Sequence, residues 1–438
     1  MEFGSFLFRI MHLEGRTAIL VKNTLVLSVG RLMNVLAGVA TAALLARCLG
    51  TGGYGKYLLL FAYVSLIVEA SGVSIEAILV RDLSKNLKSL GVLVSNAILI
   101  KIVGGAVGGA FLLPVIYLTK PDYDLLISGI PASVSIIVSS VIIVYVSIIR
   151  ASLKLEREIS VDLIGKFFFL GISALSLMII IKEGVLVAIT ICFLLSEVLR
   201  LIIARKLSRA LSRPEIRIDG KAVKYLLKQS VPLGLANTIA SLYRRLDKIL
   251  ITQLIGFTAV GLYGAAYKFI EIVWIISGII MTSIYPLLSR DSSAGNRELF
   301  QSYRRALVYN GLIGIIITIF ILTTGRGLIL FLYGKEFEGS VGLLFILSFL
   351  SPFILVGNIL GHIMVILEKQ GIPYITTRVG SLVVQVLLIF LLVPLLDIAG
   401  VAYSLIITEG VACCVLFLFI ELTFRKRASK EIELGLQK

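Results

Sequence analysis

Residues 44–68 read LLARCLGTGGYGKYLLLFAYVSLIV, two apolar stretches joined by a short glycine-rich break. The pattern in this break occurs twice, and the second copy is shifted by 206 positions, from residue 49 to residue 255, in a chain of 438. The copies consist of Leu49-Gly50, Gly55 and Tyr57, and of Ile255-Gly256, Gly261 and Tyr263. Membrane transporters are commonly built from two like halves with a substrate site between them, so the repeat predicts a protein of this kind.

The composition requires a bilayer as solvent. Hydrophobic residues make up 58% of the chain, charged residues 16%, and the mean hydropathy is +1.02, whereas soluble proteins contain about 45–50% apolar and about 25% charged residues. About 20 apolar residues cross the hydrocarbon core as a helix, while barrel strands alternate over about ten. The long continuous runs therefore predict an all-α integral membrane protein with twelve transmembrane helices. The predicted spans are residues 24–46, 57–80, 91–118, 125–149, 163–181, 184–204, 230–255, 259–288, 306–325, 340–366, 372–395 and 398–422.

The net charge of +16 comes from 42 basic and 26 acidic residues. Most Lys and Arg lie in alternate segments between the spans, and the intervening segments hold few. The basic segments are residues 1–23, 81–90, 150–166, 200–228, 290–305, 367–371 and 423–438. This bias follows the positive-inside rule and predicts that both termini are cytoplasmic. Because topology already accounts for the charge, the sequence argues against nucleic-acid binding.

A long polar stretch, residues 205–229, divides six predicted spans from six. An even number of spans in each half returns the chain to the same side, so the halves are expected to be parallel repeats about a pseudo-twofold axis along the membrane normal. The expected parts are an N-terminal cytoplasmic or interfacial segment 1–23, a six-helix lobe 24–204, a basic cytoplasmic linker 205–229, a second six-helix lobe 230–422 and a basic cytoplasmic tail 423–438.

The sequence contains no enzyme or metal-binding motif. It has two histidines, His12 and His362, and no Walker A pattern, so neither a metal cluster nor an ATPase is expected. The four cysteines lie in or beside predicted spans and are interpreted as small apolar side chains. No cofactor is expected, and coupling to H⁺ or Na⁺ stays open.

The informative residues are charges inside predicted spans, since each costs about 2.5–3.5 kcal/mol at the centre of a membrane helix. The densest group is in the seventh span, where Arg244, Arg245 and Lys248 surround a single acid, Asp247. Arg31 adds a cation to the first span. Salt bridges between helices would explain such charges. Alternatively, cations in a water-filled cavity suit phosphate, which Arg binds with two parallel hydrogen bonds.

The acids of the second span are Glu69 and Glu76, seven residues apart. In one continuous helix this spacing places them two turns apart on one face. They can be protonatable coupling groups or counter-charges to the arginines, and the sequence leaves both open, as it does for Asp247.

The residues quoted above resemble the polysaccharide (Wzx-type) flippases of the multidrug/oligosaccharidyl-lipid/polysaccharide exporter superfamily. The similarity lies in Ala46-Arg47, Leu49-Gly50 and Tyr54-Gly55, in Arg81-Asp82 after the second span, and in RRLDKILITQLIG and VGLYGAAYKFIEIV in the second half. The motifs are degenerate one by one, but they occur in this order over nearly the whole chain.

The resemblance implies two six-helix lobes that form a V around a central cavity, with alternating access. It further implies that a lipid-linked sugar phosphate or diphosphate moves from the cytoplasmic to the outer leaflet of the plasma membrane. Membrane lipids and glycan-assembly enzymes are the implied partners. The cations that fit phosphate binding in such a cavity are Arg31, Arg244, Arg245 and Lys248, with Arg47 at the outer end of the first span.

Three other functions compete with the flippase. One is a multidrug or small-molecule antiporter of the same fold. Multidrug members often carry an acid in the first or seventh span, whereas here the first span has Arg31 and the seventh is net positive, which favours an anionic substrate. The others are a membrane-embedded glycosyltransferase or polymerase, for which the predicted external loops are short, and an assembly scaffold.

Overall fold

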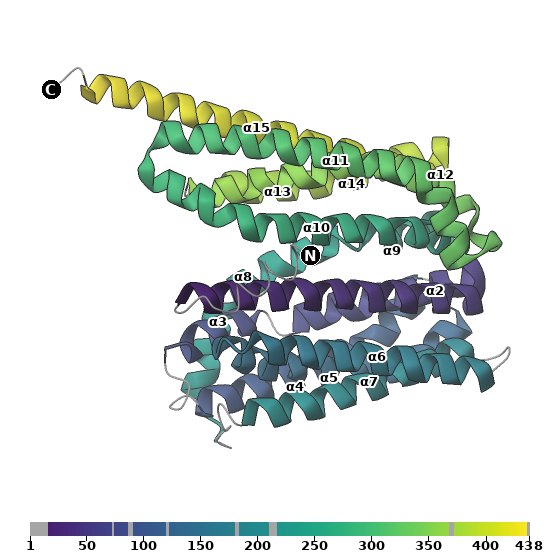
Figure 1. Ribbon diagram of the computed structural model, residues 1–438. Helices are drawn as coiled ribbons and strands as arrows, with labels where there is room; N and C mark the ends of the chain where they lie inside the picture. The colour runs from purple at the N-terminus through teal and green to yellow at the C-terminus, as the bar shows by residue number, and fades with distance from the viewer. Residues whose placement is uncertain are drawn as a thin grey trace, which may run out of the picture. The chain divides into compact units, whose positions relative to one another are not determined.

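The computed structural model describes residues 16–71, 74–85, 91–119, 122–179, 184–209, 217–367 and 372–435, and in these residues it contains helices and no strand (Figure 1). The predicted all-α class is thus confirmed for the part of the chain described. The helices are α2 (Arg16–Ser71), α3 (Ile75–Leu83), α4 (Gly91–Thr119), α5 (Tyr123–Ala151), α6 (Leu155–Ile179), α7 (Val185–Arg209), α8 (Gly220–Tyr243), α9 (Leu246–Leu254), α10 (Phe257–Ala294), α11 (Asn296–Tyr333), η1 (Lys335–Phe337), α12 (Gly339–Ser348), α13 (Leu350–Ile366), α14 (Ile372–Leu396) and α15 (Ile398–Gly435).

Within these residues, 10 helical stretches are long and apolar enough to cross a membrane, which makes the chain a multi-pass membrane protein. The sequence predicted twelve. The difference has two sources. The first two predicted spans share one candidate stretch in α2, Leu32–Ser71. The seventh, 230–255, divides into α8 and α9 around Arg244 and Arg245, and neither piece is a candidate span.

The predicted break around residues 47–56 is a kink rather than a loop. Gly50 has φ 65° and ψ −178° inside α2, while the residues on both sides are helical. This region of backbone space is open to glycine because it has no Cβ. The chain therefore turns at one residue, and a second helical segment follows the kink.

A second break falls inside the predicted span 57–80. Helix α2 ends at Ser71 and α3 begins at Ile75, after Ser74 with φ 57°. Glu69 and Glu76 consequently lie on different helices. The expectation that they share one helical face is wrong, because seven-residue spacing sets a common face only in an uninterrupted helix.

The helices pack into two compact units. Unit 1 comprises residues 1–49 and 56–246, and unit 2 comprises residues 50–55 and 247–438. Helix α8 thus belongs to unit 1. The predicted division of the chain stays a prediction. Its segments are residues 1–23, 24–204, 205–229, 230–422 and 423–438, and residues 1–15 lie outside the described ranges.

Unit 1 is built around α5, which packs against α4 and α7. Two glycines of α4 allow its backbone to approach α5 closely. A Cβ at Gly105 would lie 2.9 Å from the backbone of Ile137, and one at Gly109 would lie 2.7 Å from Ser133 O. These small residues thus allow close packing of the two helices.

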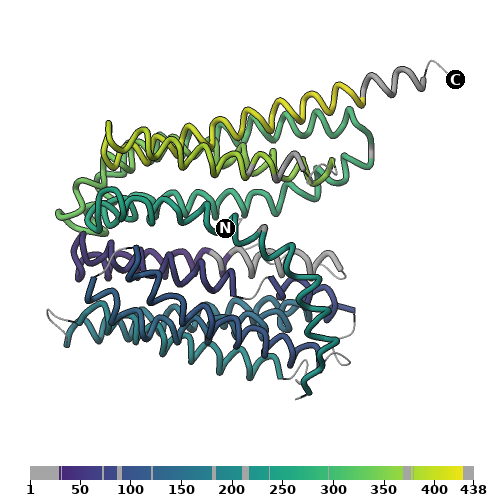
Figure 2. Tube along the Cα trace, turned by 180° about the vertical axis from the view of Figure 1, so that it is seen from behind, coloured from purple at the N-terminus to yellow at the C-terminus, as the bar shows by residue number. Residues whose placement is uncertain are grey.

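The first turns of α8 dock on α3 and α4 within unit 1 (Figure 2). The Asn96 side chain donates to Arg217 O and accepts from Asp219 N, both at 3.0 Å. Tyr225 Oη donates to Asp82 Oδ2 at 2.8 Å and accepts from Arg81 at 2.9 Å. Burial alone would raise the pKa of Asp82, but the hydrogen bonds from Arg81 and Tyr225 outweigh it and hold this pKa below its usual value of 3.8.

Unit 2 consists of α9 to α15 with residues 50–55. Helix α15 runs beside α14 and α13 (Figures 1 and 2). The two copies of the sequence repeat meet here. A Cβ at Gly55 would overlap Phe257 O, and one at Gly261 would overlap Thr51 O. The contact is reciprocal, since both pairs are related by the repeat offset, and it requires glycine at both positions.

Candidate functional site

The cation-rich segment of the seventh predicted span is divided by the fold. Arg244 caps α8, Arg245 follows it in the turn, and α9 starts at Leu246. The boundary between the two units falls after Leu246. The two arginines therefore belong to unit 1, and Asp247 and Lys248 belong to unit 2.

Arg245 is held by hydroxyl groups in unit 1. Its Nε donates to Ser65 Oγ on α2, and its Nη1 donates to Ser241 Oγ and to Ser241 O on α8. The side chain is partly buried. These hydrogen bonds to a hydroxyl on α2 and to a hydroxyl and a carbonyl on α8 fix the orientation of the guanidinium.

Lys248 belongs to a cluster that links α9 to α10 inside unit 2. Lys248 Nζ lies 3.7 Å from Glu271 Oε1, and Lys268 Nζ lies 2.7 Å from Glu271 Oε2. Lys248 Nζ also lies 5.4 Å from the centre of the Tyr267 ring, an arrangement in which the ring face attracts the cation. We call Lys248, Tyr267, Lys268 and Glu271 the Glu271 cluster. Two ammonium groups in it share one carboxylate.

Asp247, the neighbour of Lys248, is buried at the start of α9. The residue is 2% exposed, and its Oδ1 accepts a hydrogen bond from the backbone N of Lys248 at 2.7 Å. The carboxylate therefore accepts a backbone hydrogen bond within the first turn of α9. It stabilises the start of the helix that presents Lys248, since a negative group is favourable near a helix N-terminus.

The other predicted cations are placed separately. Arg31 lies on α2, but its side chain is outside the described part of the structure. Arg47 lies on α2 near the kink, and both Arg47 and Arg244 are exposed. The structure groups Lys248 with Lys268, and a common site for the five predicted cations stays a prediction.

The two predicted acids also separate. Glu76 on α3 pairs with Lys101 on α4, whose Nζ lies 3.3 Å from Glu76 Oε2 while the lysine side chain is 2% exposed. This contact supports a counter-charge role for Glu76, with a lysine in place of the expected arginine. Glu69 is partly buried on α2.

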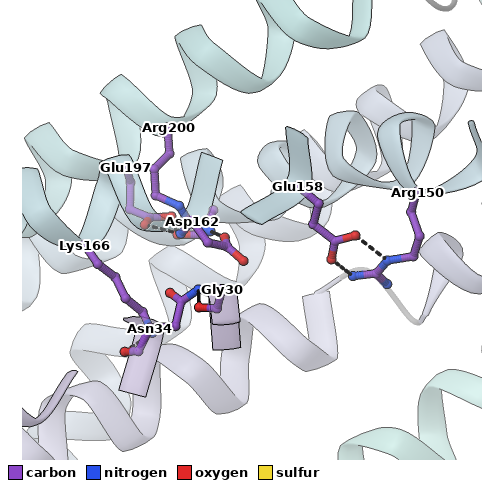
Figure 3. A network of polar contacts seen from close by, with 9 residues as sticks. Gly30, Asn34, Arg150, Glu158, Asp162, Lys166, Glu197 and Arg200 are labelled. Atoms are coloured by element: carbon purple, nitrogen blue, oxygen red, sulfur yellow. Dashed lines mark hydrogen bonds and ion pairs between the residues drawn. The ribbon is translucent and has the colours of Figure 1, made fainter. Parts of the chain in front are cut away.

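Sequence reasoning missed a second ion cluster, which lies in unit 1 (Figure 3). Arg200 on α7 lies 2.5 Å from Glu197 on the same helix and 2.6 Å from Asp162 on α6. Glu197 also accepts a hydrogen bond from Ser139 on α5 at 2.7 Å. The three-residue spacing of Glu197 and Arg200 was a usable signal, whereas Asp162 is brought in by packing alone.

The Arg200 cluster fits closely into its surroundings. A Cβ at Gly165 on α6 would overlap both Cγ and Cδ of Arg200, so the arginine stem occupies the space that this glycine leaves. Glu197 is 3% exposed. The described residues hold no group of His, Cys, Asp and Glu that fits a metal ion. The cluster therefore acts as an internal cross-link between α5, α6 and α7.

Comparisons with known proteins agree with this fold. Residues 20–292, more than half of the chain, match the family described as "Polysaccharide biosynthesis protein". The chain is 28% identical over 202 residues to the capsular polysaccharide biosynthesis protein CapF of Staphylococcus aureus, a match that covers 44% of this chain and 49% of the relative. The match thus spans about half the length of the curated relative.

Solved structures of transporters share the fold. The lipid II flippase MurJ, in an inward closed conformation, superposes with a TM-score of 0.72 at 14% identity, over 90% of this chain and 87% of the other. A multidrug resistance MATE family transporter in an inward-facing conformation gives 0.69 at 15%, over 90% and 95%. A superfamily transporter from Pyrococcus furiosus with a binding pocket of reverse polarity gives 0.66 at 15%, over 93% and 96%.

The family predicted from the paired glycine motif and the charged seventh span is therefore confirmed over most of the chain. Ten candidate spans, the match across residues 20–292 and the shared transporter fold lead to one assignment. The chain belongs to the polysaccharide biosynthesis protein family of multi-pass membrane proteins.

Proposed function

We propose that the protein is a flippase, and not an enzyme, that moves a lipid-linked oligosaccharide phosphate or diphosphate from the cytoplasmic to the outer leaflet of the plasma membrane by alternating access. The family and the fold shared with a lipid II flippase support membrane translocation. The observation that carries the choice of an anionic substrate is the Glu271 cluster, in which two lysines, one on α9 and one on α10, share one carboxylate.

In this proposal the phosphate groups bind cations that flank the break between α8 and α9. Lys248 supplies an ammonium from α9, and Lys268 supplies a second from α10. Arg245 supplies a guanidinium that serine hydroxyls already orient. Arg31, Arg244 and Arg47 are further candidates. Both termini are proposed to lie in the cytoplasm because of the positive-inside bias.

A multidrug antiporter is the second candidate, since the chain shares its fold with a MATE family transporter. The sign of the charges separates the two functions. Cationic drugs are attracted by carboxylates, while a paired lysine cluster and Arg245 favour anions. The proposed substrate therefore carries phosphate.

The test uses purified protein in vesicles that contain a short-chain prenyl diphosphate sugar with a fluorescent tag. Wild-type protein is expected to bring the tag to the opposite leaflet, where a membrane-impermeant quencher reaches it. Lys248→Met and Arg245→Met should each slow this by about tenfold or more, because a hydrogen bond to a charged group contributes about 1.5–3 kcal/mol. Lys335→Met, in η1 and outside the cluster, is the matched control and should behave as wild type.

Unchanged flipping by Lys248→Met, Arg245→Met and Arg31→Ala, with normal amounts of protein in the vesicles, would contradict the assignment of these cations. Efflux of a cationic dye by the wild-type protein, without movement of the lipid, would favour the antiporter instead.

A further inference from the structure

The carboxylate of the Glu271 cluster faces two ammonium groups at once. Its two oxygens face two different ammonium groups, Oε2 toward Lys268 at 2.7 Å and Oε1 toward Lys248 at 3.7 Å. A phosphate offers the same arrangement, an anion with several acceptor oxygens between two cations. Glu271 and such a substrate would therefore compete for the same pair of donors.

Exposure within the cluster differs in a way that permits exchange. The Glu271 side chain is 37% exposed, that of Lys268 is 29% and that of Lys248 is 13%. The carboxylate is thus the most accessible of the three charged groups. It can move aside without the lysines moving, whereas Lys248 is held between Glu271 and the ring of Tyr267.

A transporter must also return empty. Two lysines without a facing anion are unfavourable wherever water is excluded, and a carboxylate between them lowers that cost. In water-exposed states solvent can stabilise the lysines, but during the change of conformation it is excluded. An empty carrier that supplies its own anion avoids this barrier.

We propose that Glu271 is a tethered counter-ion that replaces the substrate phosphate in the empty carrier. Loading displaces the carboxylate from Lys248 and Lys268, and release allows it to return. The lysines are then paired with an anion in both the loaded and the empty forms. This inference rests on the proposed function and adds to it a residue that controls the return step rather than binding.

The proposal predicts that a change at Glu271 slows net flipping of the lipid but leaves lipid exchange nearly unchanged. Glu271→Gln keeps the size of the side chain but removes its charge, so the empty carrier loses the carboxylate that faces both ammonium groups. Net flipping requires the empty carrier to return and should fall by about tenfold or more, as expected when charged groups lose their partner where water is excluded. Exchange of labelled for unlabelled lipid uses only the loaded carrier and should stay within about twofold of wild type.

The experiment measures both modes in vesicles. Net flipping uses the tagged prenyl diphosphate sugar in one leaflet alone, and exchange uses the same lipid unlabelled in the other leaflet. Glu271→Asp, which keeps the charge, should retain net flipping better than Glu271→Gln. Lys248→Met should lose both modes. The thermal unfolding midpoint of each variant shows that it is folded.

A second variant covers the case in which Glu271→Gln does not fold. Glu271→Gln combined with Lys268→Gln removes one positive and one negative charge together and should recover part of the net flipping. Equal loss of net flipping and exchange in the Glu271→Gln protein, or no loss of either, would overturn the counter-ion role. A wild-type protein that moves the lipid in neither assay would instead overturn the proposed function.

Discussion

Each of the two units contains a cluster of three charged residues, and the two clusters have opposite net charge. In unit 1 one cation, Arg200, is shared by two carboxylates, Glu197 and Asp162. In unit 2 one carboxylate, Glu271, is shared by two lysines. In the first cluster Glu197 is 3% exposed and the arginine stem fills the space over Gly165, whereas Asp162 is 39% exposed. We expect the Arg200 cluster to contribute more to stability than the Glu271 cluster, because Glu197 is more deeply buried than any charged group of the Glu271 cluster.

The largest expected effect is on stability, from Arg200→Met. Glu197 would be left buried and negative without its cation, and breaking a buried ion pair on one side costs about 3–5 kcal/mol. Reversible denaturation in micelles measures the change in the free energy of unfolding. The double variant Glu197→Gln with Arg200→Met should recover part of the loss. If Arg200→Met lowers the free energy of unfolding by no more than Lys268→Met does, the two clusters do not differ in their contribution to stability.

Gly165→Ala should have an intermediate effect. The added Cβ would overlap Cγ and Cδ of Arg200, so the arginine must move away from its partners. Overpacking of this kind costs about 1–3 kcal/mol. Gly171→Ala is the matched control on the same helix, since its Cβ would meet no atom of the described residues within 4 Å. In the Arg200→Met background the cost of Gly165→Ala should largely vanish; additive costs would mean that the two residues act independently.

Lys268→Met should change stability less. Glu271 keeps Lys248 as a partner, and partly exposed pairs of this kind contribute about 0.2–1 kcal/mol. The free energy of unfolding should therefore fall by no more than about 1 kcal/mol, while lipid flipping falls strongly. A variant that loses several kcal/mol would show that the Glu271 cluster is as structural as the Arg200 cluster.

The smallest effect is a pH dependence at the contact between α3 and α8. The pKa of Asp82 is lowered in the folded protein, so the contact contributes its full stability above pH 3.8 and loses it as the pH falls through the lower folded value. A spin label at Lys224→Cys on α8 should become more mobile over that range. Asp82→Asn should remove the pH response, and an identical response in that variant would assign it to another group.

Some features of the structure could be predicted from the sequence and others could not, as particular residues show. The paired motifs around Gly55 and Gly261 predicted a repeat, and their backbones meet reciprocally. Lys268 and Glu271 are three residues apart in the sequence, a spacing that lets side chains of one helix meet, and their charged atoms lie 2.7 Å apart. The expected common face of Glu69 and Glu76 failed, because the backbone turns at Ser74. The expected cation group was split by the end of α8, since hydropathy shows where a span lies but not where its helix breaks.

The sequence by itself determined the membrane class, because a composition of 58% hydrophobic residues exceeds what a soluble core can bury. It also determined contacts within one helix, since the helical period fixes which neighbours three or four residues apart can meet. Only the tertiary structure decided that Asp162 reaches Arg200 and that Lys248 reaches Glu271. Such contacts depend on the rotation and packing of separate helices, to which the residues between them contribute together.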